Sequence, residues 1–186
     1  MEINYKNPQI IVIAGKARSG KNTIGEIFKN LYEQDNKKVV ISPYTKYLKD
    51  YIKEITGNYV DDDNKPRELL QQLGVEIIKE KLKKYDMFIE RQLDDIDIYS
   101  YFFDSIIIPD ARFPKEIDIL KEKYPNVISI KVVSDLENNM TEREKQHVTE
   151  TSLDGYDDNK FDYIINNLSI EESTKLVEEI YEEIKK

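Results

Sequence analysis

Gly15-Lys16-Ala17-Arg18-Ser19-Gly20-Lys21-Asn22-Thr23 is the stretch that decides the fold of this chain. It follows an apolar run at residues 10–14 and precedes a segment with apolar residues at helical spacing up to about residue 33. A strand, a glycine-rich turn and a helix in this order are the context that a phosphate-binding loop requires. The two glycines allow positive φ, so that the backbone N–H groups can surround an anion. The N-terminus of the following helix directs its unpaired N–H groups at the same point.

The spacing Gly-x-x-x-x-Gly-Lys places Lys21 where its ammonium adds a full charge at the outer phosphates of a nucleotide. The usual motif continues with a Ser or Thr that holds magnesium. Asn22 occupies that position here and Thr23 follows it. We therefore expect residues 15–23 to bind ATP, with Mg²⁺ held near Thr23 through water. A surface turn is the alternative interpretation, and the flanking strand and helix argue against it.

The composition excludes several classes of protein. The chain has 186 residues, 39% of them hydrophobic and 35% charged, which suits one soluble domain with a full core. A net charge of −9 argues against non-specific binding to nucleic acid, although basic residues could still converge in one cleft around a small anion. There is no cysteine, no signal-peptide pattern and no apolar run of the ~20 residues that a membrane span needs. A cytoplasmic protein without a membrane partner is expected, and its oligomeric state is left open.

The order of elements predicts an α/β fold. Apolar runs indicate strands at 10–14, 39–42, 105–108, 127–133 and 161–165, with helical patterns between them, one of which runs from Pro66 to about Leu82. A capping-box pattern predicts a further helix that begins at Thr141. This alternation favours a single domain, residues 1–186, with a mostly parallel five-stranded sheet and helices on both faces. Ligands of such sheets bind beyond the carboxyl ends of the strands, here after Ala14, at 109–112 and after Ile165.

Asp110 and Arg112 follow the apolar run at 105–108, and Pro109 is expected to close that strand. A carboxylate at this strand end can hold magnesium or position water, and the arginine can reach a phosphate. An Asp–Arg pair that only caps the next helix is the alternative. Arg67 lies in the first turn of a predicted helix, where its charge opposes the helix dipole. Either a bound anion or the neighbouring Glu68 would compensate it.

Several segments resemble phage-type deoxynucleoside monophosphate kinases, a group within the nucleoside monophosphate kinase superfamily. The loop is similar to their Ser-Gly-Lys-Asp-Thr, with Asn22 in place of the aspartate. Further similarity lies in Arg67 to Gly74, in the Asp-x-Arg-Phe-Pro-x-Glu string that begins at Asp110, in the His-x-x-Glu-Thr-x-Leu string that begins at His147, and in Phe161 to Asn167. The resemblance implies a three-layer P-loop NTPase fold.

The resemblance also implies an ATP-dependent phosphotransferase that uses Mg²⁺ and acts on a nucleoside or deoxynucleoside monophosphate. It suggests an acceptor-binding helical segment at about 43–101, with Arg67 and Arg112 at the acceptor phosphate and Gln71 positioning the nucleotide or contacting its base. It suggests a lid at about 136–156, to which Arg143 would contribute, and places Asn166 near the donor base. The expected catalytic set is Lys21, Asp110, Arg112 and Arg143, with Asp110 also at the metal.

His147 is the only histidine, and a structural or lid role fits it as well as a chemical one. Two other functions remain open on the sequence. The chain could be a P-loop kinase for another small molecule, such as dephospho-coenzyme A or phosphomevalonate. It could also be a nucleotide-binding regulatory module without kinase activity, an alternative that Asn22 motivates. The identity of the acceptor and the preference for ATP or GTP are not determined by the sequence.

Overall fold

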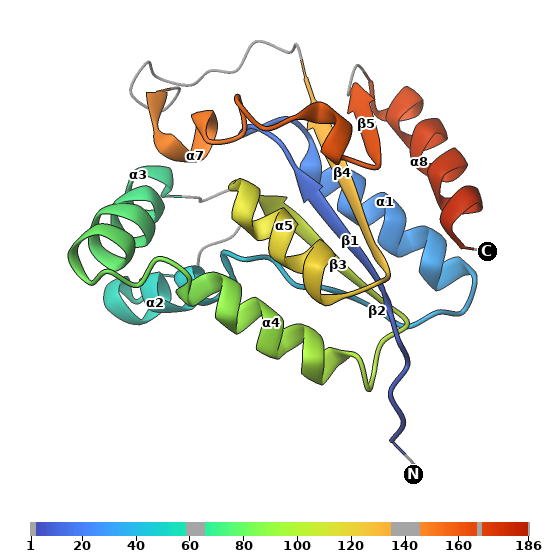
Figure 1. Cartoon of the computed structure of the whole chain (residues 1–186), viewed down its shortest axis with the longest axis horizontal. Helices are drawn as coiled ribbons and strands as arrows, with labels where there is room; N and C mark the ends of the chain where they lie inside the picture. Colours follow the sequence, from blue (N-terminus) through green and yellow to red (C-terminus); the bar gives the residue numbers. More distant parts are fainter. Residues whose placement is uncertain (1–2, 59–65, 135–145, 167–168, 186) are drawn as a thin grey trace.

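The computed structural model describes residues 3–58, 66–134, 146–166 and 169–185. Five strands form one sheet in the order β2-β3-β1-β4-β5, and each neighbouring pair is parallel (Figure 1). The strands are β1 Gln9–Ala14, β2 Val39–Ile41, β3 Ser105–Ala111, β4 Val127–Val133 and β5 Tyr163–Asn166. The predicted α/β fold with a five-stranded parallel sheet is confirmed. Because all strands are parallel, their carboxyl ends meet at one edge, where the phosphate-binding loop follows β1.

Helices cover both faces of the sheet, as Figure 1 shows. On one face, α1 (Lys21–Gln34) and α8 (Ile170–Ile184) pack against Ile11 and Ile13 of β1. On the other face, α4 (Met87–Tyr99) and α5 (Pro114–Lys123) pack against its alternate residues. Residues 10–14 are each at most 1% exposed. A strand that is buried on both faces reads as a continuous apolar run, which is why the sequence marks β1 so clearly.

A smaller helical unit stands beside the sheet. It comprises α2 (Lys46–Thr56), α3 (Arg67–Gln71) and η1 (Gln72–Lys81). These elements have their own apolar cluster of Leu48, Ile52, Leu70 and Ile78. The prediction of one regular helix from Pro66 to about Leu82 was wrong in part, because from Gln72 onward the helix is a π-helix with wider turns. Ile77, within this π-helix, is 39% exposed, whereas the next residue, Ile78, is buried.

Strand β3 is longer than the sequence predicted. Pro109 does not close it, and the strand continues to Ala111. The pairing of β1 with β3 shifts register between Val12 and Ala14, so that one extra residue of β3 is accommodated there. A proline has no N–H to donate, and a bulge is one of the few places where a sheet interior tolerates it. The consequence is that Asp110 lies within the strand and not in a turn after it.

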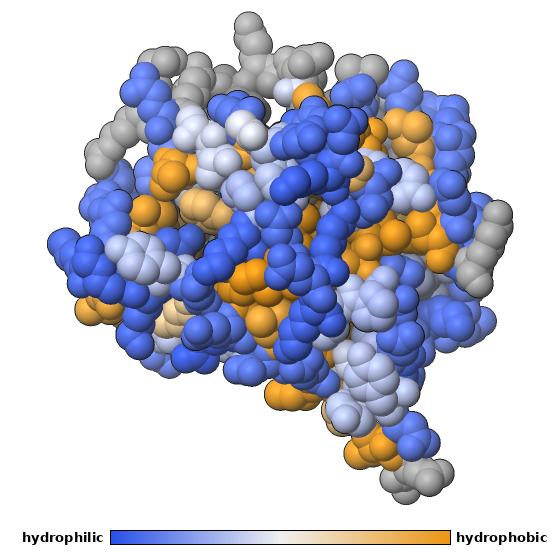
Figure 2. All heavy atoms as spheres, in the orientation of Figure 1, coloured by the Kyte–Doolittle hydropathy of each residue, from blue (hydrophilic) through white to orange (hydrophobic). Residues whose placement is uncertain are grey.

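The chain after β4 returns to described structure in a short helix, α7 (Val148–Thr151), and a 3₁₀ turn, η2 (Asp158–Lys160). The predicted start of a helix at Thr141 and the first part of the expected lid, residues 136–145, lie outside the described residues. Hydrophilic residues predominate on the face shown in Figure 2, as the share of charged residues leads one to expect. Within the described ranges no helix combines the length and the apolar character that crossing a bilayer would take.

Candidate active site

The loop between β1 and α1 depends on two glycines. Gly15 has φ +147°, and a Cβ added there would lie 2.3 Å from the backbone oxygen of Val132 in β4. Gly20 has φ +93° and forms the N-cap of α1. Arg18 also has positive φ, at +60°. The loop therefore turns tightly against the sheet, and at Gly15 both the backbone conformation and the space exclude a side chain.

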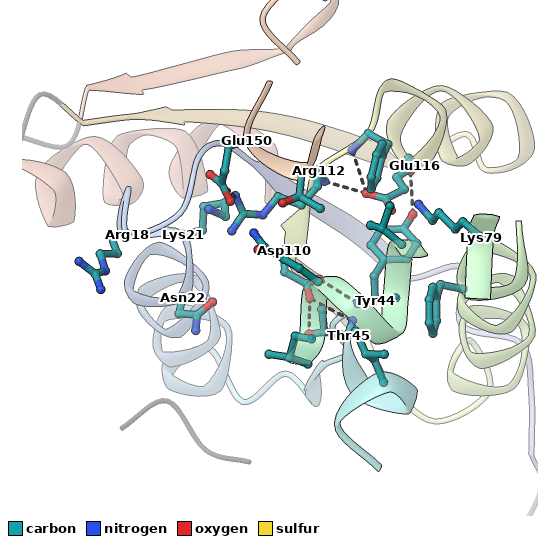
Figure 3. A pocket seen from close by; sticks show the side chains of 18 of the residues that line it. Arg18, Lys21, Asn22, Tyr44, Thr45, Lys79, Asp110, Arg112, Glu116 and Glu150 are labelled. Carbon is teal, nitrogen blue, oxygen red and sulfur yellow. Dashed lines mark hydrogen bonds and ion pairs between the residues drawn. The ribbon is translucent and has the colours of Figure 1, made fainter. Parts of the chain in front are cut away.

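Lys21 is 6% exposed, and its ammonium lies over the loop. The Nζ atom donates to the backbone oxygen of Lys16 at 2.5 Å and to Oγ of Ser19 at 3.4 Å. These contacts hold the ammonium group against the loop. Arg18 is exposed, and in Figure 3 its side chain points away from Lys21. Arg18 and Lys21 therefore differ in position, because Lys21 is buried against the loop and Arg18 points away from it.

A cavity of about 410 Å³ extends from the loop to the helical unit (Figure 3). Its lining includes many of the residues that the sequence predicted for the site: Arg18, Gly20, Lys21, Asn22, Gln71, Asp110 and Arg112. Apolar side chains line the part farther from the loop: Leu48, Leu70, Val75, Phe88 and Phe113. A charged end joined to an apolar end suits a ligand that carries a phosphate on one side and a ring on the other.

Other predicted residues lie elsewhere or cannot be placed. Thr23 is exposed on α1 and is outside the cavity lining, and so is Asn166 at the end of β5. Arg67 begins α3, but its side chain is outside the described structure, and Arg143 is outside the described residues altogether. Their expected roles stay predictions. His147 is the N-cap of α7, where Nδ1 accepts from the backbone N–H of Thr149 at 3.3 Å.

The carboxylate of Asp110 organises the start of the helical unit. It accepts from the N–H of Tyr44 at 2.8 Å, from the N–H of Thr45 at 3.0 Å and from Oγ1 of Thr45 at 2.6 Å. Thr45 is the N-cap of α2, so a residue at the end of β3 fixes this helix. Within the described structure, Arg112 pairs with Glu150 and not with Asp110. The simple Asp–Arg pair considered from the sequence does not form there.

Magnesium is the metal that P-loop kinases use, and the residues near the loop can be tested for it. Mg²⁺ in such sites takes one or two carboxylates, with nucleotide phosphates and water as the other ligands. Asp110 lines the cavity, and its Oδ1 accepts a single hydrogen bond and so retains acceptor capacity, whereas Oδ2 accepts two. No group of three or more His, Asp or Glu side chains suited to a metal occurs among the described residues. The donor set therefore fits an ion held mainly by phosphates and water.

Arg112 is fixed at three points. Its backbone N–H donates to Oε2 of Glu116 at 2.7 Å, and its backbone oxygen accepts from the hydroxyl of Ser152. Its Nη1 donates to both carboxylate oxygens of Glu150 at 3.0 Å. Glu150 in turn accepts from the N–H of Ala17 in the loop at 2.6 Å. The guanidinium is thus held between the loop and the apolar part of the cavity.

A buried acid and a cation lie at the inner wall. Glu116 is 6% exposed and also accepts from the N–H of Phe113 at 3.0 Å. Burial raises the pKa of Glu116 to about 7, although these hydrogen bonds oppose the shift. The ammonium of Lys79 lies 3.5 Å from the centroid of the Phe113 ring, and burial lowers the pKa of Lys79. Lys79 brings a polar donor to the otherwise apolar end of the cavity.

Sequence reasoning missed five of the residues that shape this cavity: Tyr44, Thr45, Lys79, Glu116 and Glu150. A signal for Glu116 was present, because proline at the first helical position and glutamate at the third are typical of a helix start, and here the Glu116 carboxylate accepts from the N–H of Phe113. Glu150 lies in the string that begins at His147, but nothing in the spacing indicates its contact with the loop. The other three depend on contacts between distant segments.

These features define a P-loop kinase, and the comparisons agree. The family model described as deoxynucleotide monophosphate kinase matches residues 32–177, which is more than half of the chain. The chain therefore belongs to the deoxynucleotide monophosphate kinase family and is a nucleotide kinase-like phosphotransferase. The match begins after the loop, so residues 15–23 are independent support for the same conclusion.

Solved structures with the same fold include shikimate kinase from Bacteroides thetaiotaomicron, at a TM-score of 0.52 and 14% identity over 95% of this chain and 98% of that one. Shikimate kinase from Acinetobacter baumannii, in complex with shikimate, has a TM-score of 0.51 and 14% identity, over 97% of this chain and 95% of that one. At this identity the likeness shows the fold alone. A comparison with curated proteins finds no match.

Proposed function

We propose that this protein transfers the γ-phosphoryl group of ATP to a nucleoside or deoxynucleoside monophosphate. The observation that carries the proposal is the cavity in which the loop and an apolar-walled pocket face each other. The loop amides and Lys21 suit the donor phosphates. The apolar walls suit the base of an acceptor, with Gln71 and Lys79 as polar contacts, and membership of the family supports a nucleotide as that acceptor.

In the proposed reaction an oxygen of the acceptor phosphate attacks the γ-phosphorus of ATP. A new P–O bond forms while the bond to the β–γ bridging oxygen breaks, which yields ADP and a nucleoside diphosphate. Lys21 and Arg112 offset the negative charge that both nucleotides bring together. Asp110 and the loop would hold Mg²⁺, which supplies further charge neutralisation at the donor phosphates when it is bound. No side chain forms a covalent intermediate in this scheme.

The test is an assay of ADP release with ATP and Mg²⁺ against a panel of ribo- and deoxynucleoside monophosphates. Lys21→Ala is expected to lower turnover by ~10² or more, the scale for losing one preorganised charge stabiliser. Lys175→Ala, which removes an exposed lysine on α8, serves as the control and should leave turnover unchanged.

Acceptor-dependent turnover that disappears in Lys21→Ala supports the proposal and identifies the acceptor. ATP binding without turnover on any nucleotide contradicts it. Turnover with dephospho-coenzyme A or phosphomevalonate would then identify a kinase of another small molecule. No turnover with any acceptor would favour the regulatory module that Asn22 suggests.

A further inference from the structure

Glu150 joins three parts of the molecule that are distant in sequence. It lies on α7, is 7% exposed, and contacts both the phosphate-binding loop and Arg112 at the end of β3. One oxygen, Oε2, accepts from the N–H of Ala17 at 2.6 Å and from Nη1 of Arg112 at 3.0 Å. A buried carboxylate is costly unless it is paired and hydrogen-bonded, so this arrangement defines one position for the guanidinium.

The surroundings of Glu150 strengthen the constraint. Ser152, two residues further along, donates its hydroxyl to the backbone oxygen of Arg112. His147 caps the start of the same short helix. The segment 147–152 therefore contacts Arg112 both at its backbone oxygen and at its guanidinium. In Figure 3, Glu150 and Arg112 lie beside Lys21, at the junction of the loop and the rest of the cavity.

We propose that Glu150 is a positioning residue for phosphoryl transfer, which holds the guanidinium of Arg112 at the junction between donor and acceptor phosphates and ties it to the loop through Ala17. This inference rests on the proposed function. Without the carboxylate the arginine keeps its charge but samples several rotamers. The cost then falls on the transfer step, because positioning contributes to the transition state and much less to ATP binding.

The first experiment compares Glu150→Gln with the wild type in steady-state kinetics. Glutamine retains an oxygen for the N–H of Ala17 but loses the charge that fixes Arg112. We expect kcat to fall by about 10- to 100-fold and the KM for ATP to change by less than about 3-fold. Asp158→Asn removes one carboxylate charge from η2, outside the cavity, and should change neither value. An unchanged kcat in Glu150→Gln overturns the proposal.

A double-mutant cycle separates positioning from a general structural role. If Glu150 acts through Arg112, adding Glu150→Gln to Arg112→Ala should change kcat by less than about 2-fold. If Glu150 instead supports the fold by itself, the two losses will multiply. If the fold-losses in kcat of the two single variants multiply in the double variant, the proposal is contradicted, even when each single variant is slow.

A third measurement does not need turnover. Nuclear magnetic resonance of the arginine side chains, with Arg112 assigned through Arg112→Lys, reports whether rotation of the guanidinium is restricted. We expect separate Nη–H signals in the wild type and averaged signals in Glu150→Gln. If the wild type phosphorylates no nucleotide yet shows this difference, the proposed function fails while the restraint by Glu150 stands. If the signals are alike in both proteins, the restraint itself is refuted.

Discussion

Gly15 leaves no room for a side chain. Its φ of +147° acts against a side chain, and so does the Val132 oxygen, which would lie 2.3 Å from an added Cβ. We expect Gly15→Ala to lower the free energy of unfolding by about 1–3 kcal/mol and to weaken ATP binding, because the loop must shift away from β4. Urea denaturation and calorimetric titration measure the two effects. Gly155→Ala, with nothing within 4 Å of the added Cβ, is the control and should leave both unchanged.

Glu116 predicts a dependence of stability on pH. Its pKa is about 7 in the folded protein, against an ordinary value of 4.5. Between these values the folded state keeps a proton that the unfolded chain releases, so the free energy of unfolding falls as pH rises. Lys79 and Asp110 face Glu116 with opposing effects, which lower and raise its pKa respectively, and burial outweighs both.

The total decline between pH 5 and 7.5 should be up to ~3 kcal/mol in the wild type. Glu116→Gln should lack this decline in the free energy of unfolding. Denaturant titrations of both proteins between pH 5 and 7.5 measure the difference. Equal declines in both proteins would show that burial does not raise the pKa of this carboxyl group.

At this scale the sequence predicted some residues of the cavity and not others. The loop could be predicted because its residue spacing and the strand and helix beside it all lie within one short stretch of sequence. The partners of Asp110 were not, because Tyr44 and Thr45 reach it across 66 and 65 residues of chain. Periodicity reports which face of an element is buried, and it carries no information about which distant backbone N–H a carboxylate will meet.

At the scale of elements, the helical unit is held by a small cluster of its own. Ile52 is 1% exposed within it. Ile52→Ala should cost ~2–4 kcal/mol of local stability, and because the unit forms one wall of the cavity, the KM for the acceptor should rise more than the KM for ATP. Hydrogen exchange of α2 and η1, read together with the two KM values, checks this. If Ile52→Ala raises the KM for ATP as much as the KM for the acceptor, this prediction is contradicted.

The π-helix and the long β3 show why boundaries were harder to predict than elements. In η1, Leu73 and Ile77 are four residues apart, which is the spacing of one face of an α-helix, whereas Leu73 and Ile78 are five apart, which places them on one face of a π-helix. The sequence therefore predicted a helix here correctly, but it did not predict that the helix is of the π type. Pro109 was taken as the end of a strand on the ordinary rule, and the bulge that makes it acceptable exists only once β1 pairs with β3.

At the scale of the whole molecule, the net charge of −9 gives a prediction about partners. Non-specific binding to DNA is driven by the release of counterions from neutralised phosphates, which an acidic protein achieves poorly. We expect no retardation of a DNA duplex in gel electrophoresis at a salt concentration of about 0.15 M. Retardation that weakens as salt is raised would contradict this and would restore nucleic acid as a partner.

The order of strands and helices along the chain was enough to predict the architecture, because few topologies satisfy the rules for parallel sheets. The place of β1 at the centre of the sheet has a further consequence. Gln9 pairs with Ser105 on one side, and Ile10 pairs with Val127 on the other. During synthesis on the ribosome, β1 emerges early, and the strands that pair with it, β3 and β4, emerge much later. A high contact order of this kind slows folding, so fragments that end before residue 127 should need chaperones and should not form a stable unit.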